Sequence, residues 1–187
     1  MKKGLISLAV ILLVVSIPAA IADDGSNQSK AQKKRAKIDT IERETLATLF
    51  GKSPKATELY GKAHGHAVFS NLKISLGLTG GGGAGVAVEK KGGRRTYMRM
   101  GTAGLNLGLG AHKYQVVFLF QDSKTFRDFI EHGWQADAGA NAVAGKAGAN
   151  AETTFTNGIA YFQLTQGGLM LQADISGTKY WKYKKLN

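Results

Sequence analysis

Glycine dominates one stretch of this chain and restricts what the chain can fold into. Twelve of its 25 glycines lie between Gly77 and Gly110, within a segment, residues 74–120, that is otherwise rich in strand-forming residues. Glycine weakens a strand because it loses more conformational freedom on ordering than any other residue. Glycine-rich strands therefore occur where a sheet bends sharply or two backbones approach closely. The stretch predicts three or four antiparallel strands of a strongly curved sheet, and it does not resemble a catalytic centre.

Three segments with helical features accompany this sheet. Residues 30–50 lack proline and glycine and carry apolar residues at helical spacing. Ser53–Pro54 supplies an N-cap and a proline at the first helical position, which predicts a short helix over residues 54–62. A third helix is expected over residues 123–132, where Gly133 ends it. The predicted fold class is α+β: a strongly curved antiparallel sheet, open or nearly closed, with an N-terminal helix and two shorter helices.

Shorter strands are expected on either side of the glycine-rich stretch. Residues 66–69 are predicted to form a strand that ends in a turn at Asn71. Residues 159–164 and 169–175 are each predicted to form a strand, and they flank a glycine-containing turn, which predicts a hairpin. The small residues at 135–152 fit either a strand or a loop.

The N-terminus has the three parts of an export signal. A basic start precedes a short apolar run, and Ala20 and Ala22 form a small-x-small cleavage site. Cleavage after Ala22 removes 22 of the 187 residues and leaves 165, enough for one domain with its own core. We therefore divide the chain into a signal peptide (1–22), a linker (23–29) and a single domain (30–187). With no cysteine, the chain has no disulfide and no lipid-modified cysteine, and we expect a periplasmic protein peripheral to the membrane.

The chain is strongly basic. Its formal net charge is +12, and loss of Lys2 and Lys3 with the signal leaves 23 basic residues against 13 acidic ones, or +10. Such an excess favours an anionic partner, although it also serves solubility. For an exported protein the available anions are phospholipid headgroups, lipopolysaccharide and polyanionic glycans, and cytoplasmic nucleic acid is excluded.

Three basic segments are the candidates for contact with that partner. Residues 30–37 begin a helix that fits either a basic amphipathic membrane helix or an ordinary surface helix. Residues 90–99 form a cationic turn. In residues 179–185 aromatic residues alternate with lysines, a pattern that fits either contact with a membrane boundary or packing of the last strand in the core. The predicted lipid-binding residues are Lys33, Lys34, Arg35, Lys37, Lys90, Lys91, Arg94, Arg95, Arg99, Lys179, Trp181 and Lys182.

Patterns that would indicate catalysis or a cofactor are weak. The glycines at 80, 82 and 85 have the G-x-G-x-x-G spacing, but a strand is predicted after them where a dinucleotide site needs a helix. His64 and His66 would share one face of a strand without a third metal ligand nearby. Asp128 and His132 lie four residues apart on a helix and fit a surface pair. No enzymatic activity, cofactor or metal is therefore expected.

A series of short motifs, each weak alone, resembles the SYLF-domain family in order and spacing. These motifs lie at residues 66–71, 80–85, 97–101, 104–110, 118–129, 133–134, 168–169 and 177–181. The resemblance covers about residues 52–187 and is greatest to exported bacterial members. It implies phospholipid binding without established catalysis, and phosphoinositides are the ligand of eukaryotic members. Asp137–Ala140 stands where eukaryotic members often carry Gly-Pro, so phosphoinositide specificity is not carried over.

The sequence thus predicts a non-enzymatic phospholipid-binding domain that acts at a membrane surface in the bacterial periplasm. Anionic phospholipids or a membrane surface are the expected partner, and any envelope protein partner is undefined. The alternative is a small outer-membrane β-barrel or a structural envelope protein, suggested by glycine-rich strands behind a signal peptide. The three expected helices, and charges such as Arg99 and Asp174 within the strands, argue against that architecture.

Overall fold

The computed structural model describes residues 22–135, 154–165, 168–170 and 177–187. The apolar run of the predicted signal and most of the small-residue segment 135–152 lie outside these ranges. No helix among the described residues is long and apolar enough to cross a membrane.

Two very long strands form the glycine-rich region. Strand β1 spans Gly65–Glu89 and strand β2 spans Arg95–Phe120, and they pair antiparallel from Gly65 opposite Phe120 to Val88 opposite Arg95. The prediction of three or four strands here, with a turn at Asn71, was wrong. Asn71 is buried within β1, where its side-chain amide donates a 2.6 Å hydrogen bond to the hydroxyl of Tyr114. This contact lets a turn-forming residue occupy a strand.

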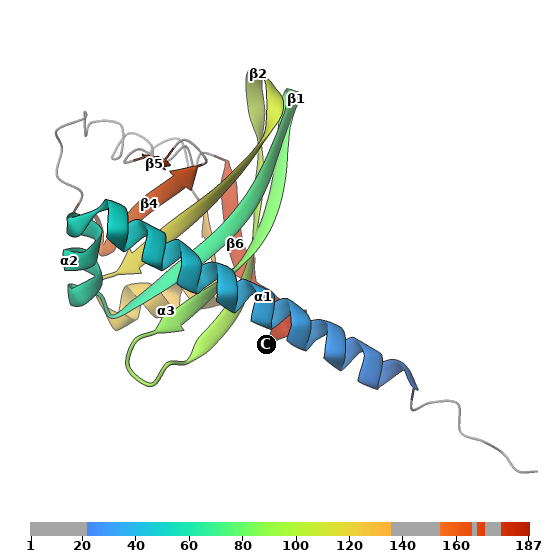
Figure 1. Ribbon diagram of the computed structural model, residues 1–187, viewed down its shortest axis with the longest axis horizontal. Coiled ribbons are helices and arrows are strands. Elements are labelled where there is room, and N and C mark those ends of the chain that lie inside the picture. The colour runs from blue at the N-terminus through green and yellow to red at the C-terminus, as the bar shows by residue number, and fades with distance from the viewer. Residues whose placement is uncertain (1–21, 136–153, 166–167, 171–176) are drawn as a thin grey trace, which may run out of the picture.

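The remaining strands complete one antiparallel sheet. They are β3 (Trp134–Gln135), β4 (Ile159–Thr165), β5 (Gly168–Met170) and β6 (Thr178–Lys182). The order is β3-β6-β2-β4-β5, with β1 on the other side of β2. The first part of β2 pairs with β6 and its last part with β4, and the sheet curls strongly between these two parts (Figure 1). The predicted α+β class with a strongly curved antiparallel sheet is confirmed.

Strand β1 curls so far that its two ends meet. The backbone N–H of Lys90, just after β1, donates a 3.1 Å hydrogen bond to the carbonyl of His64, just before it. Gly83 lies against the backbone of Ser70, and Gly85 lies against the carbonyl of Val68. A Cβ atom at either position would overlap a carbonyl oxygen, so the close approach of the two backbone segments explains why both residues are glycine.

Three helices pack around this sheet. Helix α1 spans Ala22–Lys52, so it begins eight residues before the predicted start and includes the predicted linker. Helices α2 (Pro54–Lys62) and α3 (Ser123–His132) have the predicted boundaries. The hydroxyl of Ser53 accepts a hydrogen bond from the N–H of Ala56, and Gly133, with φ of 75°, ends α3.

The core has three parts, set by the two faces of the curled sheet. The concave side encloses an aromatic cluster that includes Phe69, Phe118 and Tyr180, with the apolar face of α3 against it. Helix α1 lies across the outside of the sheet (Figure 1). Leu49 of α1 packs there in one cluster, and Ile38 packs in another with Leu186 of the short 3-10 helix η1 (Lys184–Leu186).

Candidate functional site

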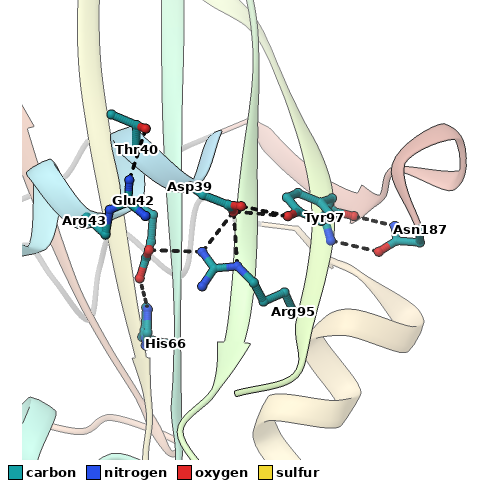
Figure 2. A network of polar contacts seen from close by, with 8 residues as sticks. All are labelled: Asp39, Thr40, Glu42, Arg43, His66, Arg95, Tyr97 and Asn187. Atoms are coloured by element: carbon teal, nitrogen blue, oxygen red, sulfur yellow. Dashed lines mark hydrogen bonds and ion pairs between the residues drawn. The ribbon is translucent and has the colours of Figure 1, made fainter. Parts of the chain in front are cut away.

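A polar network centred on the buried side chains of Glu42 and His66 fastens helix α1 to both ends of the curled hairpin (Figure 2). The two carboxylate oxygens of Glu42 have different partners: His66 Nε2 at 2.7 Å, near the start of β1, and Arg95 Nη2 at 3.1 Å, at the start of β2. Arg95 also pairs with Asp39 of α1 at 3.0 Å. Glu42 therefore links the two ends of the curl through one side chain.

The protonation of this network follows from its contacts. Burial opposes the ionisation of Glu42, but hydrogen bonds and charge from His66 and Arg95 outweigh burial and lower the pKa of the carboxyl. Burial and the hydrogen bonds to Asp39 raise the pKa of Tyr97. The side-chain amide of Asn187 exchanges two hydrogen bonds with the backbone of Tyr97, at 2.9 and 2.8 Å, and extends the network to the C-terminal residue (Figure 2). These groups hold the fold together.

Several of the predicted lipid-binding cations also contact other groups of the protein, although Lys90 and Arg94 lie at the surface. The ammonium of Lys90 donates to the carbonyls of Tyr60 and Gly61, at 2.7 and 3.1 Å, near the C-terminal end of α2. Arg94 pairs with Glu89 at 3.0 Å. Of the four basic residues at the β1–β2 turn, Lys91 alone has no such partner among the described residues. The guanidinium of Arg35 on α1 donates a 2.8 Å hydrogen bond to the carbonyl of Leu186.

A second group of cations has no carboxylate partner within the described ranges, and it gathers around Tyr183. The Lys34 ammonium donates a 2.9 Å hydrogen bond to the Tyr183 hydroxyl and lies 4.8 Å from the ring centroid. The Arg99 guanidinium lies 4.9 Å from the same centroid. The hydrogen bond from Lys34, with the charges of Lys34, Arg99 and Lys185, lowers the pKa of the tyrosine. A phenol in this setting is surrounded by positive charge.

Trp181 lies beside this group on the outer face of the sheet. It is opposite Arg99 in the β2–β6 pairing and is 38% exposed, with its indole over Gly101. Lys179, two residues earlier on β6, points to the same side because side chains alternate along a strand. We call these residues the Tyr183 surface: Lys34, Arg99, Lys179, Trp181, Tyr183 and Lys185.

The structure thus brings together four of the predicted residues from three elements. They are Lys34 of α1, Arg99 of β2, and Lys179 and Trp181 of β6. The other eight lie elsewhere. Lys33 and Lys37 are exposed on α1, and Lys182 is exposed at the end of β6. Arg35 of α1 is partly buried against Leu186, and the last four are at the β1–β2 turn.

The predicted set omitted Tyr183 and Lys185. The alternation of aromatic residues and lysines at 179–185 was the available signal, but no sequence pattern links Tyr183 to Lys34, 149 positions away.

The described residues include no group of histidine and carboxylate side chains that could hold a metal ion. His64 and His66 are instead paired with carboxylates, Glu89 at 3.1 Å and Glu42 at 2.7 Å.

The fold is that of an α+β protein with one curled sheet and a long N-terminal helix packed across the outside of the sheet. The Tyr183 surface gives this protein an aromatic and cationic face. No family model matches the sequence. The chain is 43% identical over 160 residues to Beta cell expansion factor A of Aeromonas veronii. The match covers 86% of this chain and 61% of that protein, so the chain spans less than two thirds of the length of this curated relative.

Proposed function

We propose that this protein is a non-enzymatic phospholipid-binding domain of the SYLF type that acts peripherally at an anionic membrane surface in the periplasm. The observation that carries the proposal is the Tyr183 surface. Its four cations, Lys34, Arg99, Lys179 and Lys185, have no carboxylate partner among the described residues, and the exposed Trp181 lies directly opposite Arg99.

The chemistry of this surface matches a phospholipid headgroup layer. Each basic residue near an anionic bilayer contributes about 1 kcal/mol, so four such residues supply about 4 kcal/mol. Tryptophan and tyrosine favour the boundary between headgroups and acyl chains, and lysine stems lie along that boundary with their ammonium groups at the phosphates. Lys33 and Lys37, exposed on α1, add charge to the same helix that carries Lys34.

The sequence supports the same class of ligand independently of this surface. The ordered motifs that resemble SYLF domains imply phospholipid binding, and the signal at the N-terminus, with a mature net charge of +10, implies exposure to envelope lipids. Similarity to Beta cell expansion factor A extends over most of this chain and supports a shared domain.

Vesicle flotation of the mature protein tests the proposal. We expect binding to vesicles of phosphatidylcholine with phosphatidylglycerol, and none to phosphatidylcholine alone. Raising the salt from about 0.1 M to about 1 M shortens the Debye length from about 10 Å to about 3 Å and should release the protein. Equal binding to neutral vesicles at both salt concentrations would contradict the proposal.

A matched pair of variants localises the contact. In the first, Arg99, Lys179 and Lys185 are changed to glutamine. In the second, the exposed residues Arg43, Lys52 and Arg127, none of them a predicted lipid-binding residue, are changed to glutamine, which removes the same charge elsewhere. We expect the first variant to lose about 3 kcal/mol of binding, more than a hundredfold in affinity, and the second to lose much less. Equal losses would mean that net charge alone attracts the protein to the membrane.

A further inference from the structure

We propose that the far bend of the β1–β2 hairpin enters the interfacial layer of the bilayer, as a second contact that rests on the proposed membrane function. The bend comprises residues 72–82 of β1 and 101–113 of β2. Figure 1 shows both strands rising there beyond the rest of the sheet, at the end opposite the Glu89–Arg95 turn. The ladder shifts register within this bend, between Leu76 and Gly77.

The bend exposes two large aliphatic side chains. Leu72 is 41% exposed and Ile74 is 45% exposed, and with Trp181 they are the exposed large hydrophobic residues among those described. They lie two residues apart and therefore on one side of β1. Single exposed apolar residues are ordinary on protein surfaces. Two neighbours on the same side of a projecting bend form a contact surface.

The charge of this region identifies the occupant as an anionic bilayer. Strand β2 contains no acidic residue, and Glu89, at the opposite end, is the only one in β1. Lys113 is exposed and lies directly opposite Leu72, so a cation stands beside the apolar side chain as it does at Arg99 and Trp181. A lysine in this position can reach phosphates while the leucine enters the lipid. A second copy of the chain would instead bring like charges together.

The backbone limits how deep the bend can enter. Within the described residues β1 pairs with β2 alone, so the outer edge of β1 carries unpaired backbone groups along the bend. Unpaired N–H and C=O groups are not tolerated in the hydrocarbon core. The Leu72 and Ile74 side chains therefore reach the headgroup and upper acyl region, and the strand itself stays at the interface.

Fluorescence at a single introduced cysteine tests this inference, because the chain has no native cysteine. An environment-sensitive dye is attached to an Ile74→Cys variant and, as a control, to a Thr57→Cys variant at an exposed site on α2. On vesicles that contain phosphatidylglycerol, we expect a blue shift and brighter emission from position 74 and no change from position 57. Lipids with a quencher at a shallow depth should quench position 74 more than lipids with a deep quencher.

A variant without a dye, in which Leu72→Ser and Ile74→Ser are combined, measures how much these two side chains contribute to vesicle binding. Both side chains are exposed, so the melting temperature should be unchanged, and affinity for the same vesicles should fall about tenfold. Wild-type binding without a spectral change at position 74 would overturn the bend contact and leave the proposed function standing. Absence of wild-type binding would overturn both. A blue shift at position 74 without lipid would identify a second copy of the chain as the occupant and would also overturn the inference.

Discussion

Gly83→Ala is the substitution that most directly tests how the sheet curls. The added Cβ would lie against the backbone of Ser70, overlapping its carbonyl oxygen and lying 2.9 Å from its carbonyl carbon, and 3.1 Å from the Cα of Asn71. These atoms cannot rotate away as a side chain can, because both residues are held in the β1–β2 ladder opposite Gln115 and Tyr114. Relief therefore requires the two crossing parts of β1 to separate.

The size of the effect follows from the cost of overpacking. Inserting a methyl group into a packed interior costs about 1–3 kcal/mol. The added methyl group meets backbone atoms and lies close to the buried hydrogen bond between Asn71 and Tyr114. We therefore expect Gly83→Ala to lower the free energy of unfolding by about 3 kcal/mol, the upper end of that range. For a domain of this size, about 2–4 °C of melting temperature accompanies each kcal/mol, so the midpoint should fall by about 6–12 °C.

Gly82→Ala is the matched control, one residue away. Its Cβ would point to the other side of the strand, where the nearest atom is the carbonyl oxygen of Met100 at 3.7 Å, an ordinary contact. Reduced freedom of the unfolded chain should make this variant neutral or more stable by up to about 1 kcal/mol. Thermal melting followed by circular dichroism measures both variants.

Equal melting temperatures would refute the close crossing of β1 over itself. A Gly83→Ala protein with normal melting but lost vesicle binding would instead point to a glycine loop that holds a ligand.

Two further predictions concern the contacts that hold helix α1 against the sheet and the predicted export signal. Glu42→Gln should cost about 1–3 kcal/mol at pH 7, because a buried carboxylate bonded to His66 and Arg95 is lost, whereas the exposed Glu44→Gln on the same helix should change little. The pKa of Glu42 is lowered from 4.5, so its contribution to the free energy of unfolding is complete above pH 4.5 and disappears as the pH falls through the lower folded-state pKa. Urea unfolding at several pH values should therefore show the stabilities of wild type and Glu42→Gln converging in acid. A stability difference that does not change with pH would contradict this. We predict that the chain is exported and cleaved after Ala22, so mass spectrometry of protein recovered from a periplasmic fraction should give Asp23 as the first residue; an intact N-terminus would refute this.

Local chemistry in the sequence was enough to determine the fold class and the ends of α2 and α3, but not the start of α1. Ser53 and Pro54 start α2, and Gly133 ends α3, because capping and backbone restriction act within a few residues. The density of glycine correctly indicated a sheet that bends and crosses closely, because no other residue lets two backbones approach so near.

Only the tertiary structure decided how many strands the glycine-rich stretch contains and which glycines are essential. A glycine inside a strand and a glycine in a turn look alike in sequence, so one continuous β1 was read as several strands. Gly82 and Gly83 are equivalent by position, and they differ only because Ser70 crosses one face of the strand.

The same limit applies to the basic residues, which the sequence could count but could not sort. Arg95 is bound by Asp39, 56 positions away, and Lys34 reaches Tyr183 across 149 positions. A positive charge becomes structural when the fold places a carboxylate or a carbonyl beside it, and it stays available to an anionic partner when the fold does not. The sequence by itself determined that this protein carries an excess of positive charge, and the tertiary structure decided that four of its cations gather, with Trp181, around Tyr183.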